Sequence, residues 1–328
     1  MKKILILSLL MLAGCQNNTS LYTPAEEKLL EKYGVLSEAE NNCDNPDTVK
    51  IMLKKGFKKK NLKQYCGLVT KSGDGLNEMI DAGLSKKEIK EYQSLSYFHA
   101  DKIDRYLKYE TSTIKEKVKE VNMDLDLKPY SVTHFYDEDS DLTMLINKYN
   151  SLPEGYIPSD LVDVNYVCEQ GVDYSCSTMD KMQLRKTAAE AYEKFVEAGH
   201  KKDINMVAIA TYRSYDYQSN LYNYYKAEKG EEYADTYYAR PGQSEHNSGL
   251  AVDITFNGYN YNEIEEKEGY DWILKNMHKY GFILRYPEDK TKMTLYGYES
   301  WHLRYVGVEL ATKLYKDNIT LDEYYGMK

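Results

Sequence analysis

The chain has 328 residues, with 43 Lys and Arg against 52 Asp and Glu, so its formal net charge is −9 at pH 7. This length suits one large domain or two ordinary ones. The negative charge argues against binding to nucleic acid, which a basic surface normally leads. The mean hydropathy of −0.68 excludes a protein with several membrane spans, and the scarcity of Pro (7) and Gly (19) predicts a mostly globular chain.

The first residues have the pattern of an export signal. Residues 4–13 are apolar, two lysines precede them, and Leu12-Ala13-Gly14-Cys15 closes the run. A membrane span takes about 20 apolar residues, so we interpret residues 1–14 as a signal peptide. Small residues before a cysteine resemble the bacterial lipobox, which implies lipid on Cys15 and an anchor at the extracytoplasmic face of the bacterial cell membrane. An ordinary secretory signal is the alternative.

Four further cysteines remain, namely Cys43, Cys66, Cys168 and Cys176. An even number in an exported chain favours disulfides. Proximity in the sequence favours Cys43 with Cys66 and Cys168 with Cys176. Neither pair has Cys-x-x-Cys spacing, so metal binding by these cysteines is the weaker interpretation, and free thiols stay an alternative.

Residues 15–45 are expected to form a tether with one short helix. Residues 46–118 have a helical pattern with a weak repeat of period 27, in which Met52, Gly56 and Tyr65 recur as Met79, Gly83 and Tyr92. We predict a small all-α helical module of two copies. The stretch from Lys50 to Lys63 carries seven lysines and no acid. It is either a contact for anionic wall polymer or lipid headgroups, or a solvated helix face.

Residues 119–328 mix helices and strands. We predict strands at 206–212, 250–256, 282–285 and 301–306, and helices around 184–199, 262–280 and 308–316, from the spacing of apolar residues. Helices and strands do not alternate strictly. We therefore expect an α+β fold in which helices flank a small, mostly antiparallel sheet that carries a metal site.

Two stretches combine histidine with carboxylates, Ser244-Glu245-His246-Asn247-Ser248-Gly249-Leu250-Ala251-Val252-Asp253 and Glu299-Ser300-Trp301-His302-Leu303-Arg304. Asp253 lies on the strand face opposite the apolar residues, where a buried acid is costly unless it is paired or binds a cation. Two His and one Asp suffice for catalytic zinc with a fourth position left for water, and Glu299 is the candidate base. We expect a bend between Glu299 and His302. From spacing alone, structural roles would be the commoner outcome.

These motifs, Ser-x-His-x-x-Gly-x-Ala-x-Asp and Glu-x-Trp-His-x-Arg, resemble those of the VanY-type zinc D,D-carboxypeptidases, relatives of VanX dipeptidase and of the peptidoglycan L,D-carboxypeptidases. Further matches are Tyr212-Arg213-Ser214 with Gln218, and segments within residues 147–162. The resemblance covers roughly residues 120–320, and it implies a carboxypeptidase domain at 119–328.

The resemblance implies one Zn²⁺ held by His246, Asp253 and His302, with Glu299 as catalytic base. It also implies that Arg213 acts on the substrate carboxylate or the developing oxyanion, and that Ser244 and Gln218 help to bind the terminal carboxylate. Arginine suits this task because its planar donors pair bidentately with carboxylates.

The implied substrates are peptidoglycan stem peptides, from which C-terminal D-alanine would be released. The alternatives are an L,D-carboxypeptidase acting on tetrapeptide stems, a peptidoglycan endopeptidase, and a catalytically inactive, zinc-containing wall-binding module. Arg304 either braces Asp253 or Glu299 or faces solvent. The segment 233–240 is a candidate for the pocket that holds the residue before the scissile bond, where Asp235 would supply an acidic end.

Overall fold

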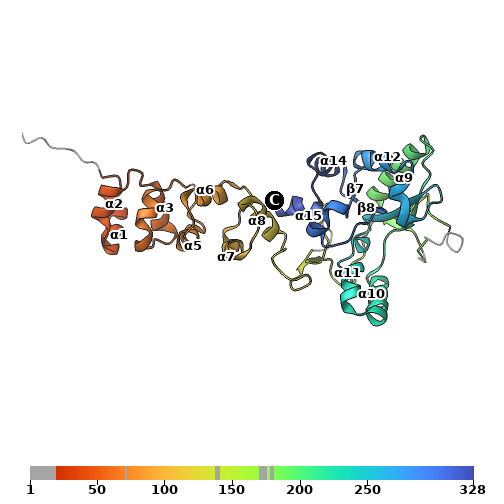
Figure 1. Cartoon of the computed structure of the whole chain (residues 1–328), viewed down its shortest axis with the longest axis horizontal. Helices are drawn as coiled ribbons and strands as arrows, with labels where there is room; N and C mark the ends of the chain where they lie inside the picture. The colour runs from red at the N-terminus through yellow and green to blue at the C-terminus, as the bar shows by residue number, and fades with distance from the viewer. Residues whose placement is uncertain (1–19, 71, 137–140, 170–175, 178–180) are drawn as a thin grey trace, which may run out of the picture. The chain divides into compact units, whose positions relative to one another are not determined.

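The computed structural model describes residues 20–70, 72–136, 141–169, 176–177 and 181–328. The chain separates into two compact units, which meet between Leu107 and Lys108 (Figure 1). The predicted signal peptide and Cys15 lie outside the described residues. Within the described ranges, none of the helices combines the length and the apolar character that a membrane span requires.

The described part of the first unit consists of short helices. They are α1 (Pro24–Tyr33), α2 (Leu36–Asn42), α3 (Asp47–Lys55), η1 (Lys59–Asn61), α4 (Leu62–Cys66), α5 (Leu76–Asp81), α6 (Lys86–Ser94), η2 (Ala100–Lys102) and α7 (Ile103–Lys108). Residues 24–42 thus form two helices where a tether was predicted. They fold because Leu30 and Ala39 are buried in the unit and Cys43 is bonded to Cys66.

Two segments of the first unit each place a backbone N–H against the hydroxyl of a buried tyrosine. The backbone N–H of Lys58 donates to the hydroxyl of Tyr65 at 3.2 Å, and His99 donates in the same way to Tyr106 at 3.3 Å. Both tyrosines are fully buried. Residues 58–65 and 99–106 therefore share one local hydrogen-bond pattern.

Part of the lysine-rich stretch is paired within the first unit. Lys55 contacts Asp74 at 3.0 Å, and Lys58 and Lys60 contact Asp81 at 2.9 Å each. These pairs are exposed to solvent and contribute little stability. A contact between this stretch and wall polymer stays a prediction.

The second unit is a mixed α and β structure. Its helices are α8 (Ile114–Asn122), α9 (Lys186–His200), α10 (Tyr215–Lys229), α11 (Glu231–Tyr237), η3 (Glu245–Ser248), η4 (Tyr261–Glu266), α12 (Tyr270–Asn276), η5 (Met277–Tyr280), η6 (Glu288–Lys290), α13 (Thr291–Thr294), α14 (Val308–Asp317) and α15 (Leu321–Gly326). Its strands are β1 (His134–Phe135), β2 (Asn150–Ser151), β3 (Leu161–Asp163), β4 (Gln183–Arg185), β5 (Met206–Ala210), β6 (Ala251–Phe256), β7 (Phe282–Leu284) and β8 (His302–Tyr305).

The α8 helix shows where the second unit begins. It packs against α15, with Val118 and Val121 buried and Lys119 Nζ 2.9 Å from Glu323 Oε1. The predicted boundary between residues 118 and 119 therefore falls inside a helix that packs as one piece. The structural boundary precedes this helix.

The main sheet is antiparallel, with strand order β5-β6-β8-β7. Its two faces differ in chemistry. Val252, Ile254 and Leu303 on one face join a core with Phe195 and Val196 of α9. The alternate residues, including Asp253 and His302, are buried on the other face, because successive side chains of a strand point to opposite sides.

The helices divide between the two sides of the unit. In Figure 1, α9 and α12 lie at the top of the view and the packed pair α10 and α11 lies at the bottom. The single helix predicted at 262–280 is broken into η4, α12 and η5. The break occurs at Gly269, whose φ of 104° is rarely adopted by residues with a side chain.

Candidate active site

Three side chains converge on the charged face of the main sheet. His246 Nε2 lies 3.2 Å from Asp253 Oδ2, and His302 Nδ1 lies 2.9 Å from Asp253 Oδ1. Their ligand atoms all lie within 4.8 Å of one another. The sheet explains this approach: β6 and β8 are antiparallel, and their register places Asp253 directly opposite His302. Opposed residues of such a pair project to the same face.

Each histidine is held through the ring nitrogen that faces away from this cluster. His246 Nδ1 is 2.7 Å from the carbonyl oxygen of Thr211. His302 Nε2 is 3.3 Å from Glu245 Oε2. A hydrogen bond at one ring nitrogen fixes which nitrogen is free to bind a metal. The two imidazoles therefore present opposite nitrogens, Nε2 of His246 and Nδ1 of His302.

The chain reaches this geometry through a tight turn between His246 and β6. The η3 helix ends at Gly249, which has φ of 67°. A Cβ atom at this position would meet Leu161 Cδ2 at 2.9 Å and Arg185 Cγ at 3.2 Å. Glycine is therefore required both by the backbone conformation and by the close packing against β3 and β4.

Burial and mutual contacts shift the pKa of each of the three side chains. Burial lowers the pKa of His246, so its imidazole is neutral. Burial alone would raise the pKa of Asp253, but His246 and His302 beside it hold that pKa well below its usual range. Burial alone would also lower the pKa of His302, but its bonds to Asp253 and Glu245 raise it to about 9. An ionised carboxylate between two imidazoles is a donor set that zinc accepts.

Glu299 lies beside this cluster. Its Oε2 is 3.7 Å from His302 Nδ1, and a quarter of its side chain is exposed. Strand β8 starts only at His302, and residues 299–302 form a turn in which the N–H of His302 approaches the carbonyl oxygen of Glu299 at 3.4 Å. The expected bend is therefore present. Burial raises the pKa of Glu299 to about 7, which suits a group that exchanges protons near neutrality.

The predicted substrate-binding residues also reach the site. Arg213 Nη2 donates to Asp253 Oδ2 at 3.3 Å, while its buried Nε has no partner among the described residues. Ser244 is buried at the same cavity. Gln218 donates its amide nitrogen to the carbonyl oxygen of Ala239 at 2.8 Å and leaves its amide oxygen without a partner. Gln218 therefore offers an acceptor, which suits a substrate N–H better than a carboxylate.

These residues line one cavity of about 680 Å³. Aromatic side chains form much of its wall, namely Tyr217, Tyr225, Tyr237, Tyr238, Tyr261, Tyr286, Tyr296, Tyr298 and Trp301. The acidic residues among its described lining are Glu245, Asp253 and Glu299, all at the cluster itself. A cavity of this size accommodates the end of a peptide.

Asp235 does not supply an acidic end to this cavity. Its carboxylate accepts two hydrogen bonds from Arg240, at 2.9 and 2.8 Å, and one from Tyr222 at 2.8 Å. Neighbouring residues of the 233–240 segment do line the cavity. The segment thus contributes to the pocket as expected, but Asp235 is neutralised by its own partners.

Sequence reasoning missed one set of residues, the buried charges beneath the cluster. Glu245 is fully buried between Arg285 and Arg304, at 2.7 and 2.8 Å. Burial alone would raise the pKa of Glu245, but these two arginines hold it well below its usual range. Arg304, for which solvent or a contact with Asp253 or Glu299 was expected, points to Glu245 instead. The position of Glu245 inside the histidine motif was the only available signal.

Both cysteine pairs lie within bonding distance, as proximity predicted. Cys43 is bonded to Cys66 in the first unit and Cys168 to Cys176 in the second, with Cα atoms 4.5 and 5.7 Å apart. Cys176 also lines the cavity. The second disulfide therefore fixes part of the cavity wall.

Known proteins share these features. Residues 181–308 match the VanY family model, described as D-alanyl-D-alanine carboxypeptidase. The chain is 38% identical over 206 residues to YodJ of Bacillus subtilis, a match that covers 61% of this chain and 72% of that protein. It is 34% identical over 187 residues to the bifunctional D-Ala-D-Ala dipeptidase and carboxypeptidase VanXYC of Enterococcus gallinarum, covering 55% of this chain and 92% of that protein.

A solved structure agrees with the sequence relatives. The LD-carboxypeptidase LdcB, whose structure was described as revealing the molecular basis of peptidoglycan recognition, superposes with a TM-score of 0.52 at 35% identity, over 61% of this chain and 96% of the other. Both histidine motifs and the four strands of the main sheet fall within residues 181–308, the range matched by the family model. The chain therefore belongs to the VanY family of D-alanyl-D-alanine carboxypeptidases, and it is a carboxypeptidase.

Proposed function

We propose that this protein is a zinc-dependent carboxypeptidase that releases C-terminal D-alanine from peptidoglycan stem peptides ending in D-Ala-D-Ala. The observation that carries the proposal is the convergence of His246 Nε2, Asp253 and His302 Nδ1 on one point at the wall of the cavity. Zinc bound there would polarise the scissile carbonyl and lower the pKa of the attacking water.

The residues around the cluster have the remaining roles. Glu299 takes the proton from the attacking water and returns it to the leaving amine, which requires a pKa near the working pH. The unpartnered Nε of Arg213 is a buried donor without an acceptor, and a substrate carboxylate would satisfy it. With Glu299 in place as a base, we do not favour an inactive wall-binding module.

The charges in the cavity favour D,D- over L,D-specificity. An L,D-carboxypeptidase cuts after a diamino acid, whose side-chain ammonium calls for a free acid in the pocket. Among the described lining residues the acids are confined to the cluster, and Asp235 is occupied by Arg240 and Tyr222. The methyl group of D-alanine needs no such partner.

Mass spectrometry of pentapeptide and tetrapeptide stems incubated with the purified protein tests this proposal. We expect conversion of pentapeptide to tetrapeptide with free D-alanine. Faster conversion of tetrapeptide to tripeptide would show L,D-specificity, and internal cleavage without free D-alanine would show an endopeptidase.

The metal is tested separately by elemental analysis and chelation. We expect about one zinc per chain, loss of activity after chelation, and recovery on return of zinc. His246→Ala should remove most of the bound zinc. A wild-type protein that contains no zinc and is unaffected by chelation would contradict the proposal.

A further inference from the structure

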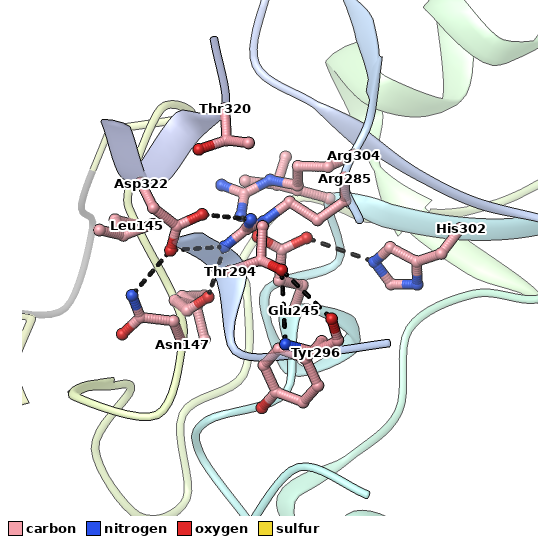
Figure 2. A network of polar contacts seen from close by, with 12 residues as sticks. Leu145, Asn147, Glu245, Arg285, Thr294, Tyr296, His302, Arg304, Thr320 and Asp322 are labelled. Carbon is pink, nitrogen blue, oxygen red and sulfur yellow. Dashed lines mark hydrogen bonds and ion pairs between the residues drawn. The ribbon is translucent and has the colours of Figure 1, made fainter. Parts of the chain in front are cut away.

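Beneath the cluster, a carboxylate connects a proposed zinc ligand to two buried arginines. Glu245 Oε1 accepts hydrogen bonds from Arg285 Nε at 2.7 Å and from Arg304 Nη1 at 2.8 Å (Figure 2). Its other oxygen, Oε2, faces His302 Nε2 at 3.3 Å. The side chains of Glu245 and both arginines have no solvent exposure.

Both arginines also contact other residues, which hold them in place. Arg285 Nη1 contacts Asp322 Oδ2 of α15 at 2.5 Å. Arg304 Nη2 donates to the backbone carbonyl of Met144 at 2.7 Å. The guanidinium groups of Arg285 and Arg304 and the carboxylates of Glu245 and Asp322 therefore form a buried group whose charges sum to zero. Glu245 is the member of this group that contacts His302 (Figure 2). Such a set is strongly destabilised when one charge is left without its partner.

This arrangement has a consequence for the protonation of His302. Neutral imidazole carries one N–H, so Nδ1 can bind a metal only when the proton is on Nε2. The nearest acceptor to Nε2 is Glu245 Oε2. Because both hydrogen bonds from the arginines go to Oε1, Oε2 is left to accept from His302.

We propose that Glu245 is a positioning residue that keeps the proton of His302 on Nε2 and so presents Nδ1 to the metal. The inference rests on the proposed zinc site. Arg285 and Arg304 hold Glu245 in a fixed orientation through their hydrogen bonds to Oε1. Glu245 thus acts through His302 without touching substrate or metal.

Glu245→Gln tests this role with little change in volume. The two arginines have only donors, so the amide oxygen would face them and the amide NH₂ would face His302. His302 Nε2 would then have to accept, which moves the proton to Nδ1 and blocks the metal. We expect E245Q to weaken zinc binding by about 10- to 100-fold, the usual effect of losing such a partner, as measured by competition with a chromogenic chelator.

Asp322→Asn is the matched control. Asp322 is also buried, also pairs with Arg285, and has no hydrogen bond or ion pair to Glu245 or His302 among those of the described residues. D322N should lower the melting temperature as E245Q does, but keep zinc affinity within about threefold of wild type, because it is one residue further from the ligand. Equal loss of zinc affinity in both variants, or none in E245Q, would overturn the proposal.

A measurement on the wild type covers the case in which E245Q does not fold. Long-range ¹H–¹⁵N spectra of the zinc-loaded protein should show the His302 proton on Nε2 and metal at Nδ1. Protonation of Nδ1 instead would contradict the proposal. A wild-type protein that binds no zinc would contradict the proposed function itself, whereas normal zinc binding by E245Q would contradict only the role of Glu245.

Discussion

At the scale of single residues, Glu299 is distinguished from the other carboxylates by its surroundings. Asp253 lies between two histidines and Glu245 between two arginines, so both remain ionised. Glu299 has a longer contact of 3.7 Å with His302, and burial outweighs the nearby His302 and Arg213 and raises its pKa to about 7. Neighbouring acids with such different pKa values have different roles. Asp253 and Glu245 hold a negative charge, and Glu299 transfers protons.

Glu299→Gln should therefore lower kcat by at least about two orders of magnitude, the usual scale for a general base, while zinc content and melting temperature stay near those of wild type. Release of D-alanine and elemental analysis measure the two quantities. Glu265→Gln is the control, because Glu265 accepts a hydrogen bond from Ser300 at 2.7 Å without lining the cavity. Near-normal turnover of E299Q would remove Glu299 from the role of base.

At the scale of elements, two connections hold the second unit around its sheet. The Cys168–Cys176 disulfide closes a short loop whose end lines the cavity. The α8 helix packs along α15, which also carries Asp322. The disulfide restrains two residues that lie outside the helices and strands, and the α8 contact joins helices from the two ends of the unit.

The Cys168–Cys176 bond should appear as a joined peptide in a non-reducing peptide map. Replacing both cysteines with serine should cost about 2 kcal/mol of stability, since the crosslink restricts the unfolded chain, and should raise KM because the cavity wall loosens. Denaturant unfolding and steady-state kinetics measure these effects. Alkylation of both cysteines without prior reduction would contradict the prediction.

The contribution of the α8–α15 contact to stability can be tested with two fragments that begin at different residues. A fragment of residues 108–328 should fold and release D-alanine. A fragment of residues 123–328 lacks the buried Val118 and Val121, and should be less stable by about 3 kcal/mol, from burial worth roughly 1.5 kcal/mol or more for each side chain. Equal melting temperatures for the two fragments would show that α8 contributes nothing to the second unit.

At the scale of the whole molecule, a first unit whose described elements are helices precedes the carboxypeptidase unit. The first helix of this unit, α1, begins at Pro24, nine positions after Cys15 in the sequence. Its charged lysine stretch is partly neutralised by Asp74 and Asp81. If Cys15 carries lipid, eight residues of sequence separate the anchor from α1.

The predicted lipid anchor on Cys15 implies that wild-type protein and a Cys15 variant are recovered in different cell fractions. Wild-type protein should be recovered with bacterial membranes, because two acyl chains give stable attachment. Cys15→Ser should not mature as a lipoprotein and should be absent from the lipid-labelled fraction. Fractionation with a labelled fatty acid measures both, and equal release of the two proteins into the medium would contradict the lipobox.

The sequence by itself determined the α+β class and the main strands to within a few residues, because alternation is a local property, and the resemblance of its two histidine motifs to those of the VanY-type family identified the clustered residues. It did not determine the folding of residues 24–42 or the start of the second unit, because both depend on contacts with distant helices. It also could not show that Asp253 and His302 lie directly opposite each other, because the register of two paired strands is set by how the strands align in the fold. Glu245, Arg285 and Arg304 meet only in the tertiary structure, where burial makes each charge depend on the others.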